Sequence, residues 1–151
     1  PAATHLAYAL CMQCMQTHTN DPIRVVESFL GALEANDEER AFALLADDVV
    51  YQNVPLPADH GKAAVRRTLQ GFERFVSDFR VKMVNIAAHG DVVLTERIDI
   101  LSGRFVYLDI WVCGTFELRD GKITLWRDYF DLAAASAKLL TGPFRKLFGR
   151  V

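Results

Sequence analysis

The chain has 151 residues, of which 51% are hydrophobic and 24% charged, with a formal charge of −2 at pH 7. This length suits one domain with a real core and is too short for two. The slight negative charge lacks the basic footprint of a nucleic-acid-binding protein, and no apolar run could cross a bilayer. Three cysteines without framework spacing (Cys11, Cys14 and Cys113) favour a reducing compartment, and we expect a cytoplasmic protein.

The first twenty residues have weak apolar periodicity, so we expect a poorly patterned arm over 1–20 and a single domain over 21–151. Because the chain begins at Pro1 rather than Met, we expect a processed or trimmed chain. The "LAYALCM" stretch is short and lacks a basic flank, which argues against a signal peptide. Cys11, Cys14 and His18 offer three ligands where zinc usually has four, so we predict no metal site.

Apolar residues at helical spacing follow the arm in three successive segments. Pro22 suits the first position of a helix, and Asn20 or Asp21 can cap it. The predicted helices cover residues 20–37, 37–48 and 61–79, and an extended segment, "VVYQNVPLP", separates the second from the third.

Beyond these helices the pattern changes to alternation, which is typical of strands. Short turn sequences, "HGD", "SG" and "RDG", separate the alternating runs, and Gly114 could mark a bulge in the longest of them. The terminal stretch reads as a helix broken at Gly142 and Pro143, followed by a basic end. The predicted strands cover residues 79–88, 92–101, 104–118 and 122–132.

Helices first and sheet second is the order of an α+β fold. We therefore predict a curved, mixed and mostly antiparallel sheet with the N-terminal helices packed on one face. Such a sheet, closed on one side by helices, leaves a cone-shaped cavity, where we expect a ligand.

Two strands carry charged residues on faces that could point inward. In "LTERIDI" (94–100), Arg97 and Asp99 share one face, and Asp128 lies between Trp126 and Phe130 on another strand. If the faces meet, an Asp-Arg-Asp cluster lies in an apolar cavity. Such a triad is net negative, and its simplest resolution is for one carboxyl to hold a proton. One acid and one base would then share the pocket.

Each piece also has a simpler interpretation. Arg97 and Asp99 alone could form a solvated ion pair worth about 0–1 kcal/mol, and Asp128 alone could be a surface carboxylate. Tyr51 alone is more often a core aromatic, and Asn53 a turn residue. Tyr51 and Asn53 nevertheless share one face of an extended segment, and a phenol and an amide together can orient a water molecule.

The chain resembles the limonene-1,2-epoxide hydrolases, small bacterial enzymes with the cystatin-like/NTF2-like cone. The resemblance runs from about Pro22 to about Asp131 and rests on motifs in the family's order. These motifs are "YQN" (51–53), "LTERIDIL" (94–101), "IWVCG" (110–114) and "ITLWRDYFD" (123–131).

The resemblance implies a role for each of five residues. Asp128 would be the general base, Asp99 the general acid and Arg97 the bridge, while Tyr51 and Asn53 would hold the water. It implies hydrolysis of a small apolar epoxide, cyclic or terpene-like, to a trans-1,2-diol without a cofactor. It also implies a homodimer formed through the sheet, to which Phe105, Tyr107 and Trp111 would contribute. The expected substrate-binding wall is Leu30, Leu33, Phe72, Leu101, Leu108, Ile110, Trp126 and Phe130.

Two rival classes remain open. A ketosteroid isomerase-like, dehydratase-like or cyclase-like enzyme shares this cone, but such sites use an oxyanion hole or a histidine, and no histidine is placed to serve. A non-catalytic binding module would keep the apolar residues but would gain nothing from an acid and a base on one arginine. The sequence does not choose among terpene, cyclohexene, styrene and fatty epoxides, and it gives Glu96 no role.

Overall fold

A computed structural model describes residues 21–104 and 106–138, so the expected arm, Phe105 and residues 139–151 of the terminal stretch lie outside the described residues. The elements follow in the order α2 (Pro22–Glu34), α3 (Glu38–Ala43), β1 (Leu45–Val54), β2 (Asp59–His60), α4 (Lys62–Glu73), β3 (Asp78–His89), β4 (Val92–Ser102), β5 (Tyr107–Arg119) and β6 (Lys122–Tyr129). Residues 132–138 are helical.

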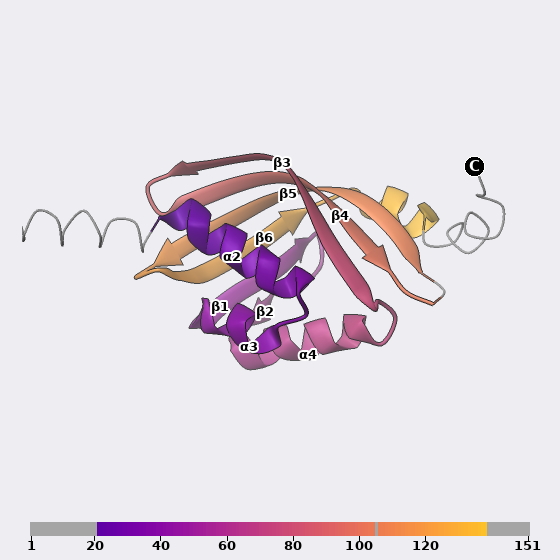
Figure 1. Cartoon of the computed structure of the whole chain (residues 1–151), viewed down its shortest axis with the longest axis horizontal. Helices are drawn as coiled ribbons and strands as arrows, with labels where there is room; N and C mark the ends of the chain where they lie inside the picture. Colours follow the sequence, from indigo (N-terminus) through magenta and orange to yellow (C-terminus); the bar gives the residue numbers. More distant parts are fainter. Residues whose placement is uncertain (1–20, 105, 139–151) are drawn as a thin grey trace, which may run out of the picture.

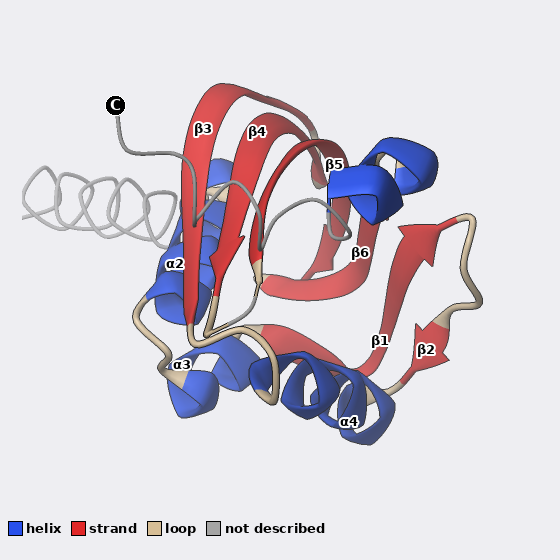
Figure 2. Ribbon diagram, turned by 90° about the vertical axis from the view of Figure 1, so that its right-hand side faces the viewer, coloured by secondary structure: helices blue, strands red, loops and turns tan. Residues whose placement is uncertain are grey.

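The described strands form one six-stranded sheet in the order β2-β1-β6-β5-β4-β3. Strands β3 to β6 make the predicted antiparallel meander, while β1 pairs with β6 in parallel. The sheet curls strongly, and α2 lies across it while α4 runs beside β1 (Figures 1 and 2). The predicted α+β class and curved sheet are therefore confirmed.

Helix α2 shows how sequence signals produce the packing. Asp21 caps it by accepting a hydrogen bond from the Ile23 backbone N–H at 3.1 Å, and proline occupies its first turn. Its apolar face buries Val26 and Phe29 completely. Burying a side chain such as Phe29 contributes roughly 1.5–3 kcal/mol. The same face places Leu33 and Glu34 at the cavity.

All three predicted helices end earlier than expected, the first of them at Glu34. The second stops at Ala43, because Leu45 enters β1 opposite Ile123 and both side chains are fully buried there. The third stops at Glu73, and the Ser77 backbone N–H donates to the Ser102 carbonyl at 2.9 Å as the chain enters β3. In both places tertiary pairing outweighs local helix preference.

Gly114 lies in a regular part of the sheet, so the bulge considered there is wrong. It pairs with Thr95 on one side and Asp128 on the other, and the register of β5 against β6 shifts further along, between Glu117 and Leu118. A glycine within a strand can instead mark a close approach by another group. At Gly114 the group that approaches closely is the guanidinium of Arg97.

In the part of the chain that the structure describes, no helix has the length and apolar character needed to cross a membrane.

Candidate active site

Three buried charges form the centre of the site. Arg97 on β4 is fully buried and donates through Nε to Asp99 Oδ1 at 2.8 Å and through Nη2 to Asp128 Oδ2 at 2.7 Å. The two carboxylates are 6% and 4% exposed. Of the two orientations that the alternation of "LTERIDI" left open, the inward one is observed, and the arginine bridges the two aspartates as the family resemblance implied.

The guanidinium has a partner for each of its nitrogens. Nη1 donates to Thr95 Oγ1 at 3.0 Å, and the Phe116 ring centroid lies 5.9 Å from the guanidinium carbon. Burial lowers the pKa of Arg97, but the charges of Asp128 and Asp99 outweigh this effect and raise it overall. The arginine therefore stays charged, and the desolvation cost of a buried cation is offset by well-aligned hydrogen bonds.

Burial also changes the ionisation of both aspartates. It raises the pKa of Asp99 to about 6, against the opposing effect of the Arg97 charge. It raises the pKa of Asp128 as well, while Arg97 and the Trp126 hydrogen bond act to lower it. Two buried carboxylates on one cation leave an excess negative charge, which a single shared proton removes.

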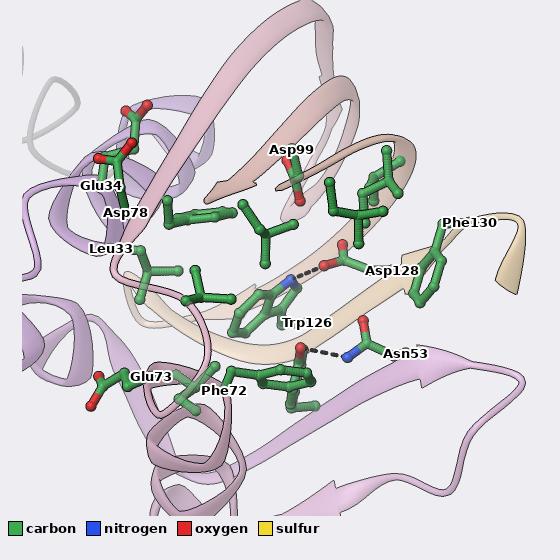
Figure 3. Close-up of a pocket in the computed structure, with 18 of the residues that line it drawn as sticks. Leu33, Glu34, Asn53, Phe72, Glu73, Asp78, Asp99, Trp126, Asp128 and Phe130 are labelled. Atoms are coloured by element: carbon green, nitrogen blue, oxygen red, sulfur yellow. Dashed lines mark hydrogen bonds between the residues drawn. The ribbon is translucent and has the colours of Figure 1, made fainter. Parts of the chain in front are cut away.

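Asp128 has two unequal oxygens. Oδ2 accepts from Arg97 and, at 2.8 Å, from the indole Nε1–H of Trp126 (Figure 3). Oδ1 is buried and has no hydrogen-bond partner within the described part of the chain. An unsatisfied buried acceptor is costly and is a feature that a ligand can satisfy.

Tyr51 and Asn53 on β1 lie beside this centre. Asn53 Nδ2 donates to the Tyr51 hydroxyl at 2.6 Å, and Figure 3 shows Asn53 on the strand next to that of Asp128. The parallel register places Asn53 directly across from Asp128. Burial, and then the Asp128 charge, raise the pKa of the Tyr51 phenol, which therefore stays neutral. The pair offers both donors and acceptors beside the carboxylate.

A cavity of about 560 Å³ opens onto these groups. This volume is within the usual range for small-molecule sites. Asp99, Asp128, Tyr51 and Asn53 all line it, and so do seven of the eight predicted wall residues: Leu33, Phe72, Leu101, Leu108, Ile110, Trp126 and Phe130. Leu30 does not line the cavity; it is 3% exposed and packs in the core.

The sequence interpretation missed two supporting residues. Thr95 shares the face of Arg97 and Asp99, so alternation alone could have identified it. Gly114 has no side chain, and a Cβ there would lie 2.3 Å from Arg97 Nη1 and 2.5 Å from Thr95 Oγ1. The arginine thus crosses the sheet over Gly114 to reach Asp128. Nothing in the sequence could distinguish this role from a bulge.

Metal chemistry has no obvious ligand set here: in the described ranges, no group of three or more His, Cys, Asp or Glu side chains could hold a metal ion.

The comparisons with known proteins agree with this geometry. A sequence model of the limonene-1,2-epoxide hydrolase catalytic domain matches residues 20–140. Epoxide hydrolase EphG of Mycobacterium tuberculosis is 44% identical over 117 residues, which is 78% of each chain. The solved structure of an M. tuberculosis LEH-like epoxide hydrolase is 41% identical, with a TM-score of 0.77, and covers 85% of this chain and 96% of that one.

A more distant structure shows the fold alone. An NTF2-like protein from Burkholderia pseudomallei is 16% identical with a TM-score of 0.71, and the match covers 80% of this chain and 97% of that one. Fold and site together define an NTF2-like domain with a buried Asp-Arg-Asp centre in an apolar cavity. The chain belongs to the limonene-1,2-epoxide hydrolase family, a family of epoxide hydrolases.

Proposed function

We propose that this protein hydrolyses small apolar epoxides to trans-1,2-diols in one concerted acid–base step. The observation that carries the proposal is the buried Asp99–Arg97–Asp128 triad, which opens onto a cavity beside Tyr51 and Asn53. A cavity that served only to bind apolar ligands would gain nothing from two desolvated carboxylates on one arginine.

The hydrogen bonds assign the acid and the base. Within the described residues, Asp128 accepts hydrogen bonds from Arg97 and Trp126, whereas Asp99 accepts one from Arg97. Hydrogen bonds to the charged form favour ionisation, so Asp128 is the base and Asp99 holds the shared proton. The pKa of about 6 for Asp99 keeps this acid partly protonated near neutral pH.

The reaction is then a single displacement. Tyr51, Asn53 and Asp128 hold a water, which passes a proton to Oδ1 of Asp128 because Oδ2 already accepts two hydrogen bonds. The water oxygen attacks an epoxide carbon from the side opposite the breaking C–O bond, which inverts that carbon. Asp99 gives its proton to the epoxide oxygen as the bond breaks. Positioning and paired acid–base help lower the barrier together.

The wall of the cavity supports the substrate class. Leu101, Leu108, Ile110 and Phe130 surround the reacting groups with apolar surface. A neutral epoxide with a hydrocarbon ring or chain fits this lining.

The experiment that tests this proposal is a single turnover in ¹⁸O-labelled water with cyclohexene oxide and limonene oxide. We expect the oxygen added to the diol to come from the labelled water and no label to enter Asp99 or Asp128, because no covalent enzyme ester forms. Label in either carboxylate would overturn the one-step mechanism.

Substitution tests the two roles separately. Asp128→Asn and Asp99→Asn should each reduce kcat by at least a hundredfold, in line with the usual contribution of general acid–base groups. Circular dichroism should show an intact fold in both. Near-normal turnover in one variant would remove that residue from the mechanism, and no turnover of any epoxide by the wild type would favour a binding protein.

A further inference from the structure

Trp126 connects the base of the proposed reaction to the residues that hold the water. Its side chain is 4% exposed and lines the cavity, and its indole N–H donates to Asp128 Oδ2 at 2.8 Å. Its ring lies 4.1 Å from the Tyr51 ring, centroid to centroid, with 33° between the planes. One side chain therefore contacts both halves of the site.

The sheet register explains this arrangement. Across β5, β6 and β1, Phe116, Trp126 and Tyr51 form one row of paired residues. Gly114, Asp128 and Asn53 form the next row across the same three strands. Each of them lies two residues along its strand from the corresponding aromatic residue. Because side chains two apart in a strand share a face, an aromatic row lies directly beside a polar row.

A hydrogen bond joins the two rows on each of two strands. Trp126 donates to Asp128 along β6, and Asn53 donates to Tyr51 along β1. Phe29 on α2 packs edge-on against the indole at 5.0 Å, and Phe116 stacks beside it with 10° between the planes. The indole is thus held by neighbours on three sides and cannot turn its N–H away without disturbing the core.

We propose that Trp126 is a positioning residue of the reaction. Its N–H fixes the carboxylate of Asp128 so that Oδ1 takes the proton from the water, and its ring sets the place of the Tyr51 hydroxyl. This inference rests on the proposed function, since it concerns the base of that reaction. The hydrogen bond also favours the ionised base, because it is made to the charged form of Asp128.

The most informative variant replaces the indole N–H of Trp126 and keeps the shape of the ring. The chain has only two tryptophans, and the other, Trp111, lies on the opposite face of the sheet, where its N–H donates to Glu96 at 3.0 Å. In a Trp111→Phe background, biosynthetic replacement of tryptophan by benzothienylalanine therefore changes Trp126 alone. The new ring has nearly the same size and shape, but sulfur replaces the N–H. Trp126→Phe is the simpler companion variant.

Loss of a hydrogen bond to a charged acceptor should lower kcat at neutral pH by roughly tenfold or more. The acidic limb of the kcat/KM profile, which reports ionisation of the base, should move upward by roughly one pH unit. The loss of kcat/KM should therefore be larger on the acidic side of this limb than above it, where only the effect on positioning remains. Trp111→Phe alone, the matched control, should retain the wild-type profile.

A second measurement does not depend on turnover. Carboxyl ¹³C NMR follows the ionisation of Asp128 directly, and its midpoint should rise in the benzothienylalanine protein and in Trp126→Phe. An Asp128 midpoint that is unchanged in both variants, together with an unchanged acidic limb, would overturn the inference and leave the epoxide chemistry standing. A wild-type protein that turns over no epoxide would instead overturn the proposed function, and the inference with it.

Discussion

At the scale of single residues, the site depends on one buried arginine that pairs with two carboxylates. Arg97 is fully buried and has one acceptor for each nitrogen. Removing any acceptor would leave part of a buried cation unpaired, which typically costs several kcal/mol. The two carboxylates differ in their donors, and this difference, rather than residue type, separates the proposed base from the proposed acid.

The raised pKa of Asp99 makes stability depend on pH. Its folded-state pKa of about 6 exceeds its ordinary value of 3.8, so the folded protein binds this proton more tightly than the unfolded chain does. The contribution of this proton to the free energy of unfolding is fully present below pH 3.8 and is lost as the pH rises through 6. The full loss is about 3 kcal/mol, from 1.36 kcal/mol per pKa unit.

Asp99→Asn lacks this titration. The Tm of the variant minus the Tm of the wild type should therefore be larger at about pH 7.5 than at about pH 4.5. Thermal melts of both proteins at these two pH values measure this difference. Asp47→Asn is the matched control, because it makes the same substitution at a side chain that is 97% exposed. A pH-independent difference for Asp99→Asn would contradict the raised pKa.

At the scale of elements, the meander brings the site together through its register. Thr95 on β4, Gly114 on β5, Asp128 on β6 and Asn53 on β1 lie in one row across the strands. Arg97 leans across the glycine to join β4 to β6. The glycine is needed for its lack of a Cβ rather than for conformational freedom.

Gly114→Ala should therefore disable the site. The new methyl group would lie 2.3 Å from Arg97 Nη1, so the guanidinium must move. We expect kcat to fall at least a hundredfold and stability to fall by about 1–3 kcal/mol, as measured by steady-state kinetics and urea unfolding. Gly71→Ala in α4 is the control: nothing lies within 4 Å of the place that a Cβ would take there, and alanine favours a helix. Equal kinetics for both variants would contradict the close approach.

At the scale of the whole molecule, the outer face of the sheet exposes large apolar side chains. Trp111 is 54% exposed, Leu94 55% and Tyr107 42%. Glu96 lies among them and accepts hydrogen bonds from Asn85 and Trp111, which gives this residue a structural role that the sequence did not reveal. Exposed apolar surface of this kind marks interaction sites. We propose that two copies of the chain pair through this face.

Trp111→Lys tests the pairing. A charge at the centre of the apolar face should convert a dimer to a monomer at micromolar concentration in sedimentation velocity, because a buried unpaired charge is costly. Lys62→Glu, on α4 and away from this face, should leave the mass unchanged. A monomeric wild type would refute the pairing without affecting the proposed chemistry.

The sequence by itself determined the class of fold, the meander and the shared face of Arg97 and Asp99 in "LTERIDI", because alternation and turn residues are local signals. That this face is buried was decided by the tertiary structure. Motif order was also enough to indicate the family. The ends of the helices, the role of Gly114, the placement of Leu30 in the core and the bond from Trp126 to Asp128 needed the tertiary structure. The helix ends and the role of Gly114 depend on pairing between strands that are distant in the chain, and no local pattern records which residues become neighbours across a sheet. The burial of Leu30 and the bond between Trp126 and Asp128 depend on side-chain packing, which spacing along the chain does not reveal.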